Sequence, residues 1–478
     1  MDLLIEKARY ILTLDPKRRI LRRASIHVRD DRIVRIGPAD QVTAETQAIT
    51  FDRVIDASRD LVMPGMVDAH LHLTEQLSRG IIPDHLRTVE WVYDYGKAVY
   101  SSMDPEDEYV ATLFASLDMI KTGTTCFIDQ GVYNPEMTSV RATAEIGIRG
   151  VAGRHAADKP PEKSRPNWKP GWLEKQYAST EETLKELERV VREYNNTADG
   201  RIRAWSNIEG KVHHTTDALY VGAKDIADRY GVGTMYHLAS SIEEAQRVEQ
   251  ETGKWPVGHA YDIGALGSNV LLAHAVNVQE DEIDLLAETG TNVVFCPGTS
   301  MKLGKGAARM GVHDRMIDRG VNVALGCDGV CAFGSSDMVR QMFMASGLYR
   351  DGRMEPTILP AQTVLEMATL GGSRALLWDD EIGSLELGKK ADIVLFDMDR
   401  PQWIPCHDPV QTLVYSADGA SCETVLIDGK VVLEKGVLQT MDEGEILARA
   451  RESAAKMAKK AGLRSDLLEG WEERMAAP

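Results

Sequence analysis

The sequence indicates an α/β protein built around a closed parallel barrel, and three observations support this. Eight short apolar runs rich in β-branched residues recur through the middle of the chain, and segments of helical period separate most of them. Both ends of the chain contain short strand patterns instead. A length of 478 residues accommodates such a barrel, which takes about 250 residues or more, together with a smaller domain.

Short strands are predicted at both ends of the chain. There, apolar and β-branched runs are interrupted by turn residues such as Gly-Pro and Asp-Gly. These predicted strands are Leu3–Ile5, Ile26–Val28, Ile33–Ile36, Asp392–Asp397 and Thr424–Lys430.

The barrel is predicted from the alternation of strand and helix in the middle of the chain. Eight strand-then-helix units are typical of a closed parallel barrel. The candidate strands are Val62–His72, Thr124–Asp129, Gly150–Arg154, Arg201–Ile208, Gly233–Leu238, Val270–Val276, Asn292–Cys296 and Asn322–Cys327. Examples of the intervening helices are Glu181–Tyr194, Asp217–Tyr230, Gln279–Glu288 and Ser335–Leu348.

Two further segments have their own character. Asp158–Trp172 is rich in Pro, Lys and Trp, has no periodicity and follows the third barrel strand. It is either a surface loop or a lid over the top of the barrel. Glu443–Trp471 is rich in Ala, Glu and Lys, which predicts one or two terminal helices on the outside of the fold or at a subunit contact.

The net charge and the cysteine content argue against several classes of protein. Lys plus Arg number 55 and Asp plus Glu 73, so the net charge of −18 argues against nucleic-acid partners and against an anionic membrane surface. Six cysteines without a C-x-x-C pair indicate a reduced, cytoplasmic protein. Charged residues within the first seven positions argue against a signal peptide, and the lack of a long apolar run argues against a membrane span.

Histidines and an aspartate lie at the ends of the predicted barrel strands. His70 and His72 share one face of the first strand, since residues two apart on a strand point the same way. His237, His274 and Asp328 lie at the carboxyl ends of strands five, six and eight, where barrel enzymes build their sites. Taken singly, such residues are often structural. Together they predict a site for Zn²⁺, Fe²⁺, Co²⁺ or Mn²⁺, with Zn²⁺ as the first choice.

Short motifs with a recognisable pattern are spread over nearly the whole chain. They are Met63–His72, Lys121–Thr125, His237–Ala239, Ala273–Ala275, Cys296-Pro297, Gly326–Gly329, Gly388–Val394 and Val425–Gly429. Together these motifs resemble the amidohydrolase superfamily, in particular the branch with triazine hydrolases and deaminases of S-adenosylhomocysteine and guanine.

The resemblance implies a distorted (β/α)8 TIM barrel over residues 63–385 that binds one metal ion through His70, His72, His237 and Asp328. It also implies a small β-sandwich made from residues 1–62 and 386–440, with a helical tail over 441–478. A homodimer or higher homo-oligomer is typical of the relatives.

The chemistry of such a site agrees with the resemblance. A bound metal ion lowers the pKa of water to about 7. Asp328 would accept the proton of this water, and His274 would hydrogen-bond the water or the developing oxyanion. The leaving group is an amine, ammonia or a halide.

The chain departs from this branch at two positions. Ser240 stands where a H-x-x-E motif places its glutamate, and a serine cannot hold a carboxylic proton. Gly210 stands where a P-H-A-P motif places its histidine. The candidates for replacing these substrate contacts are Ser240, Glu209, His213, His214 and His155.

The departures favour one function and keep two alternatives open. The first is metal-dependent hydrolysis of a non-peptide C–N bond (amide, urea, carbamate or amino-heteroaromatic) or a C–Cl bond of a small molecule. The second is deamination of a nucleobase, a nucleoside or a compound like S-adenosylhomocysteine. The third, weighed last, is a non-catalytic scaffold. Trp91, Trp168 and Trp172 would suit an uncharged or heteroaromatic substrate.

Overall fold

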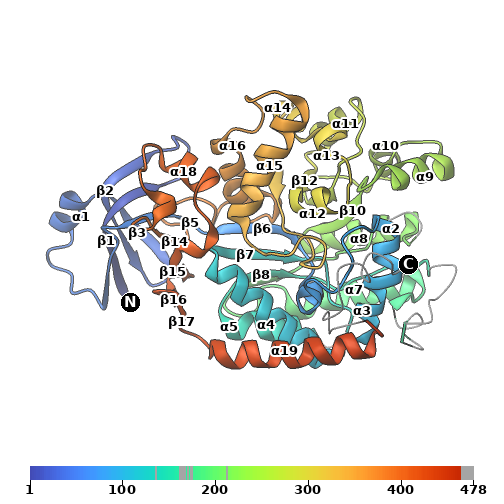
Figure 1. Cartoon of the computed structure of the whole chain (residues 1–478), viewed down its shortest axis with the longest axis horizontal. Coiled ribbons are helices and arrows are strands. Elements are labelled where there is room, and N and C mark those ends of the chain that lie inside the picture. Colours follow the sequence, from blue (N-terminus) through green and yellow to red (C-terminus); the bar gives the residue numbers. More distant parts are fainter. Residues whose placement is uncertain (135–136, 161–167, 170–171, 173–175, 211–213, 464–478) are drawn as a thin grey trace, which may run out of the picture.

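The chain forms a barrel and an adjoining sheet (Figure 1). The computed structural model describes residues 1–134, 137–160, 168–169, 172, 176–210 and 214–463. The strands of the sheet come from both ends of the chain, and the barrel is made from the middle. The predicted α/β barrel and its second, β-rich part are therefore confirmed.

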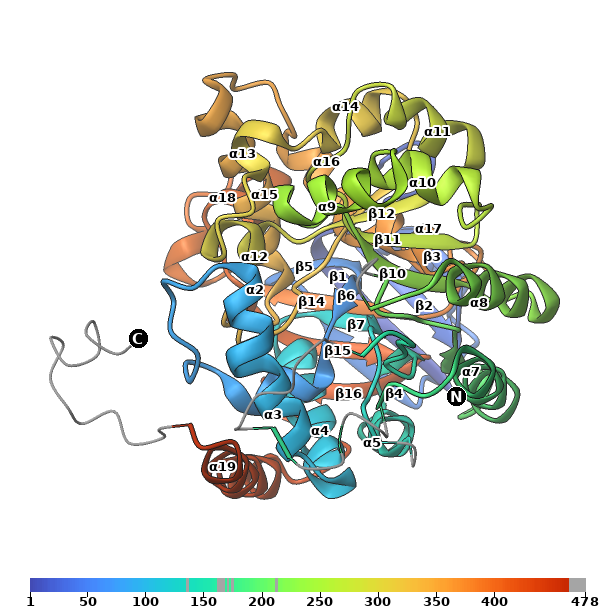
Figure 2. The same ribbon diagram turned by 90° about the vertical axis from the view of Figure 1, so that its right-hand side faces the viewer.

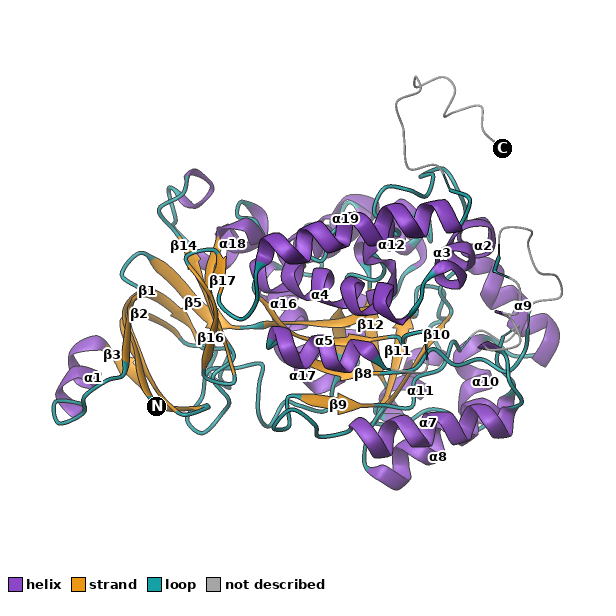
Figure 3. Cartoon of the chain, turned by 90° about the horizontal axis from the view of Figure 1, so that it is seen from below, coloured by secondary structure: helices purple, strands orange, loops and turns teal. Residues whose placement is uncertain are grey.

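The sheet has nine strands within the described residues, in the order β17-β16-β15-β14-β5-β1-β2-β3, with β4 paired to β1. Strand β5 pairs antiparallel with β14, which joins the two ends of the chain. The sheet folds over on itself around a separate apolar core that includes Leu3, Val62 and Ile393 (Figure 3). Its elements are β1 (Asp2–Leu12), β2 (Ile20–Arg29), β3 (Arg32–Pro38), α1 (Ala39–Glu45), β4 (Arg53–Asp56), β5 (Asp60–Pro64), β14 (Ile393–Asp397), β15 (Cys422–Ile427), β16 (Lys430–Glu434) and β17 (Val437–Leu438).

The barrel consists of two four-stranded parallel sheets, β6-β7-β8-β9 and β10-β11-β12-β13. Backbone hydrogen bonds bring their edges together: Asp328 N donates to His70 O at 2.8 Å, and His237 N donates to Glu209 O at 3.2 Å. All eight predicted barrel strands are present. Their bounds are β6 (Met66–Leu71), β7 (Thr124–Asp129), β8 (Arg149–Ala152), β9 (Ile202–Ala204), β10 (Thr234–Leu238), β11 (Val270–His274), β12 (Asn292–Phe295) and β13 (Val323–Leu325).

The first predicted barrel strand, Val62–His72, is divided into β5 and β6. Gly65 lies between them, and a Cβ atom there would lie 2.0 Å from Thr125 Oγ1. The chain passes from one sheet to the other at this residue because only glycine allows so close an approach. The apolar run continues through both strands, so hydrophobicity alone does not reveal the division.

Helices follow the barrel strands and surround them (Figure 2). The predicted helices Glu181–Tyr194 and Asp217–Tyr230 correspond closely to α7 and α8, and those at Gln279–Glu288 and Ser335–Leu348 to α11 and α15. The helices are α2 (Thr88–Glu90), α3 (Lys97–Ser102), α4 (Pro105–Lys121), α5 (Thr138–Ile146), α7 (Thr180–Tyr194), α8 (Asp217–Tyr230), α9 (Ile242–Thr252), α10 (Pro256–Asp262), α11 (Glu282–Thr289), α12 (Pro297–Lys302), α13 (Ala307–Met310), α14 (His313–Asp318), α15 (Met338–Arg353), α16 (Ala361–Glu366), α17 (Gly372–Ala375), α18 (Pro409–Tyr415) and α19 (Glu443–Lys460).

The last described helix, α19, lies along α4 (Figures 1 and 3). Lys456 Nζ lies 2.7 Å from Asp104 Oδ2 and 2.9 Å from Asp107 Oδ1, at the start of α4. The predicted terminal helix is thus present over 443–460, and residues 464–471 of that prediction lie outside the described part of the chain. No helix among the described residues is long and apolar enough to cross a membrane.

A buried ion-pair network connects the barrel to the sheet. Arg149, at the start of β8, is fully buried and donates through Nε and Nη2 to Asp392 at 2.7 and 3.0 Å. Its Nη2 also lies 3.2 Å from Asp428 Oδ1. Both aspartates border strands of the sheet, so this arginine fixes the sheet against the barrel.

Candidate metal centre and pocket

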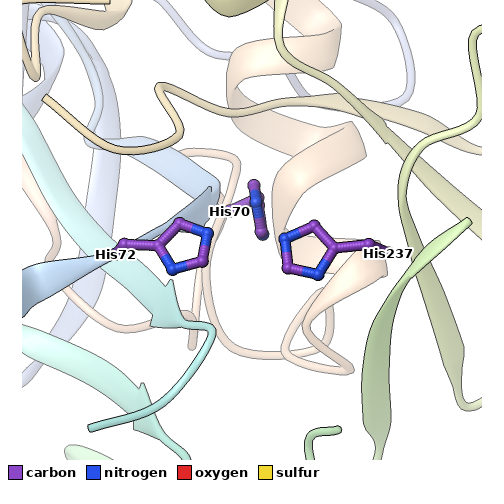
Figure 4. A group of neighbouring side chains, drawn as sticks. All are labelled: His70, His72 and His237. Atoms are coloured by element: carbon purple, nitrogen blue, oxygen red, sulfur yellow. The ribbon is translucent and has the colours of Figure 1, made fainter. Parts of the chain in front are cut away.

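Three imidazoles meet at the carboxyl ends of the barrel strands. His70 and His72 project from the end of β6, and His237 projects from β10 toward them (Figure 4). One ring nitrogen from each histidine lies within 4.8 Å of the others. Both ring nitrogens of His70 and Nδ1 of His72 are buried and make no hydrogen bond within the described residues. Such a cluster of imidazole nitrogen donors fits a divalent metal ion.

Asp328 completes the group from the end of β13. Its Oδ1 lies 3.5 Å from Nε2 of both His70 and His72. Burial opposes ionisation of Asp328, but the neighbouring imidazoles of His70 and His274 and the ammonium of Lys305 outweigh it and hold the pKa of this carboxyl well below its usual range. Asp328 is therefore a carboxylate, as a metal ligand or proton acceptor must be.

Neighbouring groups set the tautomer of His237 and the protonation state of His72. His237 Nδ1 lies 2.8 Å from the carbonyl oxygen of Glu209. A carbonyl only accepts, so Nδ1 carries the proton and Nε2 is left with its lone pair facing the cluster. Burial, with a contribution from His70, lowers the pKa of His72 to about 3, so this ring is neutral at physiological pH.

His274 lies beside the cluster with a lysine against it. Its Nε2 is 3.7 Å from Asp328 Oδ2 and 3.2 Å from Lys305 Nζ. Burial, and then the charge of Lys305, holds the pKa of His274 well below its usual range. This ring is therefore neutral and can accept a hydrogen bond. Lys305 was not predicted, because a single lysine in the loop after α12 carries no sequence signal.

A pocket of about 470 Å³, including its mouth, opens over these residues. Two predicted contacts, His155 and Glu209, face each other in its wall as a buried imidazole–carboxylate pair. The residues that line the pocket are His72, Glu75, Thr88, Trp91, Val92, Lys97, Tyr100, Tyr133, His155, Glu209, His237, His274, Thr299, Leu303, Lys305, Asp328 and Ala332.

Glu75 is a pocket residue that the sequence did not indicate. It accepts hydrogen bonds from the Tyr100 hydroxyl and from Cys331 Sγ, the latter at 2.7 Å. A Cβ atom at Gly329 would lie 1.4 Å from Glu75 Oε2. The glycine after Asp328 thus makes room for a buried carboxylate, which no local pattern signals.

Ser240 is not among the residues that line the pocket. Its hydroxyl donates to Glu244, one helical turn further on, and Glu244 Oε2 also accepts from Ser240 N at 3.1 Å. Gly210 has a φ of +82°, and a Cβ there would lie 2.4 Å from Tyr236 Cβ. A larger residue at position 210 would displace β10.

The other predicted contacts differ in position. His214 is buried against the Tyr93 hydroxyl and also does not line the pocket, and His213 lies outside the described residues. Of the possible lid, Trp168 Nε1 donates to Tyr93 O at 3.0 Å and Trp172 packs near Tyr133. Most of the segment between 161 and 171 lies outside the described residues.

Comparisons with known proteins agree with the fold. The model of the amidohydrolase family matches residues 61–432. A 5'-deoxyadenosine deaminase of Methanosarcina acetivorans is 33% identical, covering 96% of this chain and 99% of the relative. A 5-methylthioadenosine/S-adenosylhomocysteine deaminase of Thermoanaerobacter pseudethanolicus is 30% identical, over 96% and 99%.

Solved structures with a similar fold also come from enzymes. An adenosine deaminase from Xanthomonas campestris with bound zinc superposes with a TM-score of 0.86 at 26% identity, covering 96% of this chain and 99% of the other. A zinc complex of an atrazine chlorohydrolase from Arthrobacter aurescens TC1 has a TM-score of 0.85 at 22% identity, over 95% and 100%, and shows the shared fold.

Proposed function

The chain belongs to the amidohydrolase family, and on this premise we propose that it releases ammonia or an amine from an sp² ring carbon of a small amino-heterocycle. The family and its relatives make it a metal-dependent hydrolase of C–N bonds other than peptide bonds, so the scaffold alternative is set aside. The observation that carries the proposal is the convergence of three imidazoles and one carboxylate at the base of a pocket.

The proposed metal ligands are His70, His72, His237 and Asp328. A divalent ion held there, which we propose to be zinc, supplies Lewis-acid activation of water. Zinc is supported by the zinc-bound solved relatives and by the nitrogen-rich donor set.

Asp328 is the proposed acceptor of the proton of the attacking water, because its pKa lies well below neutral and it borders the imidazole cluster. His274 is neutral and 3.7 Å from Asp328, so it can orient that water through Nε2. Lys305 Nζ lies 3.2 Å from His274 Nε2, and its positive charge would stabilise the oxyanion that develops beside this ring.

The His155–Glu209 pair is the proposed replacement for the missing glutamate at position 240. Both side chains line the pocket, whereas Ser240 is hydrogen-bonded to Glu244. A carboxylate paired with an imidazole can hold and return one proton, which a serine cannot do. We assign this pair to protonation of the ring nitrogen or the leaving group.

A second candidate is deamination of an adenosine-like substrate, and the relatives at 30–33% identity favour it. Against it stand Ser240 and Gly210, which depart from the family motifs. Hydrolysis of a C–Cl bond is supported only by solved structures of shared fold.

Ammonia and amine release by zinc-loaded protein separates these candidates. The panel contains adenosine, 5'-deoxyadenosine, 5-methylthioadenosine, S-adenosylhomocysteine, guanine, aminopyrimidines and aminotriazines. Release from the adenosine-like compounds supports the second candidate, and release from the simple amino-heterocycles alone supports the first. No turnover of any member by zinc-loaded protein would contradict both. H70A/H72A should be inactive, and His259→Ala on α10 is the matched histidine control.

Two broader expectations accompany this proposal. We propose that the protein acts in the cytoplasm, with six free cysteines in support, and that it assembles as a homodimer or larger homo-oligomer. Light scattering of the full chain tests the assembly.

A further inference from the structure

Lys97 is a buried cation in the pocket wall. It lies at the start of α3, is 1% exposed and lines the pocket. Among the described residues its ammonium makes no hydrogen bond or ion pair. The ring faces of Trp172 and Tyr177 lie near the ammonium, with centroids 5.9 and 5.6 Å from Nζ.

Such a position is costly for the folded protein. Lysine is almost never fully buried unless it is paired, and burial of a charge without a hydrogen-bonding partner is unfavourable. Cation–π contacts near 6 Å offset part of this cost. They leave the three N–H donors of Lys97 available to a ligand in the pocket.

The carboxylates of the pocket are already engaged. Glu75 accepts from Tyr100 and Cys331, Glu209 faces His155, and Asp328 borders the imidazole cluster. None of them forms an ion pair with Lys97 within the described residues. No carboxylate among the described residues complements Lys97, so its ammonium is available to an anionic ligand in the pocket.

We propose that Lys97 binds a carboxylate of the substrate, whose ring lies against the stacked side chains of Tyr100 and Tyr133 in the pocket wall. A single ammonium matches the single charge of a carboxylate. Resting on the proposed function, this makes the substrate an amino-heterocycle that carries a carboxylate. It replaces the expectation of an uncharged substrate.

Calorimetric titration of the zinc-loaded full chain with benzoate, benzamide and phenylphosphonate tests the proposal. Benzoate and benzamide have nearly the same shape and differ in charge. The wild type should bind benzoate about 10-fold or more tightly than benzamide, as expected for a charge-assisted hydrogen bond. Equal binding of the two, or tighter binding of phenylphosphonate than of benzoate, would overturn the carboxylate assignment.

Variants at position 97 identify the residue responsible. Lys97→Met should lose the preference for benzoate, and Lys97→Arg should retain it. Lys185→Met, which removes an exposed lysine of α7, is the charge-matched control and should behave as wild type. A benzoate preference that survives in Lys97→Met would place the anion elsewhere, for example on the metal ion, and refute the role of Lys97.

Thermal unfolding supplies a second readout. Removal of an unpaired buried charge should leave the Tm of Lys97→Met equal to or higher than that of wild type. A fall in Tm would mean that the ammonium is structural, contrary to the proposal.

The result is separable from the proposed function. Zinc-loaded protein that binds benzoate selectively but turns over no amino-heterocycle would support the anion site and contradict the reaction. Turnover of neutral amino-heterocycles in preference to their carboxylates would support the reaction and contradict the anion site.

Discussion

Glu108 is a buried carboxyl group on α4, away from the metal centre. It accepts hydrogen bonds from Tyr133 N at 2.8 Å and Asn134 N at 3.2 Å. Burial nevertheless raises the pKa of Glu108 to about 8. The folded protein therefore holds a proton on this side chain over a range in which the unfolded chain, with a pKa near 4.3, has released it.

We expect Glu108→Gln to reduce the pH dependence of stability. The native state of the wild type binds more protons than the unfolded state between about pH 4.3 and 8, so its free energy of unfolding falls as pH rises through that window. The amide carbonyl can still accept from the backbone, but it does not titrate. Urea unfolding at pH 5 and pH 8 measures how much the free energy of unfolding falls between these two pH values. This fall should be smaller in the variant than in the wild type by at least ~1 kcal/mol.

Other buried carboxyls, such as Asp129 with a pKa raised by burial to about 7, act in the same direction but are common to both proteins. The difference between wild type and variant therefore isolates Glu108. Equal pH dependence in the two proteins would show that Glu108 is ionised in the fold.

Residues at strand ends were predictable, and residues brought in by loops and helices were not. The positions of His70, His72 and Asp328 follow from the register of a parallel barrel, in which the carboxyl ends of all strands meet. Lys97 and Lys305 approach the same pocket from a helix and a loop whose paths depend on tertiary packing. A single lysine forms no motif or periodic pattern, so the sequence alone did not identify these two as pocket residues.

At the scale of elements, the junction between β8 and the sheet depends on one buried guanidinium. Arg149 is the hydrogen-bonding partner of Asp392 and Asp428 at distances of 2.7 to 3.2 Å. Removal of one member of such a buried network leaves uncompensated charge in the interior.

Arg149→Leu should lower the free energy of unfolding by roughly 3–5 kcal/mol, because Asp392 would be left buried beside an apolar side chain, whereas Asp428 keeps its ion pair with Lys390. Unfolding by urea and by guanidinium chloride should give the same loss. Guanidinium chloride is a salt and screens surface ion pairs, but the ion pairs of Arg149 are buried. Arg192→Leu on the exposed face of α7 is the control and should change stability by less than about 0.5 kcal/mol. A similarly small change in Arg149→Leu would mean that the sheet and barrel are joined by apolar packing alone.

The type of each major element was easier to predict than its ends. The helix over 217–230 was predictable because its apolar period is regular and Thr216 caps its first turn. The strand predicted over 201–208 is regular only at Ile202–Ala204. Beyond Ala204 the backbone is joined to β10 only by isolated hydrogen bonds, such as the one from Ile208 N to Met235 O. The apolar pattern in the sequence is therefore longer than the regular strand.

At the scale of the whole molecule, metal binding should be coupled to stability. The imidazole cluster draws on β6 and β10, which belong to the two separate halves of the barrel. An ion that binds only the folded chain stabilises it by about 2.7 kcal/mol at 100 times its dissociation constant.

Zinc added to chelator-treated protein should therefore raise the Tm by about 3 °C. The H70A/H72A double variant should show no such shift, because two of the four proposed ligands are lost. His259→Ala should respond as wild type. Differential scanning fluorimetry measures all three, and an equal zinc response in the double variant would place the ion at another site.

The barrel could be predicted because eight alternating strand-helix units form a long-range pattern, and the joining of the two strand-rich chain ends was implied by the resemblance to the amidohydrolase superfamily. The point of division between the two parts could not, because Gly65 interrupts an unbroken apolar run only through its contact with Thr125. The lack of nucleic-acid and membrane partners stays a prediction from the net charge of −18.

The sheet made from both chain ends also has a consequence for the order of events during synthesis. Pro64 of β5 is paired with Ile393 of β14, so β5 emerges from the ribosome several hundred residues before its neighbour. At ordinary translation rates this delay is on the order of tens of seconds. During that time the barrel can fold while one edge of β5 stays unpaired, and in a polysome this edge is open to the same strand of a neighbouring nascent chain. Timely docking of the last strands thus protects the newly made protein from aggregation.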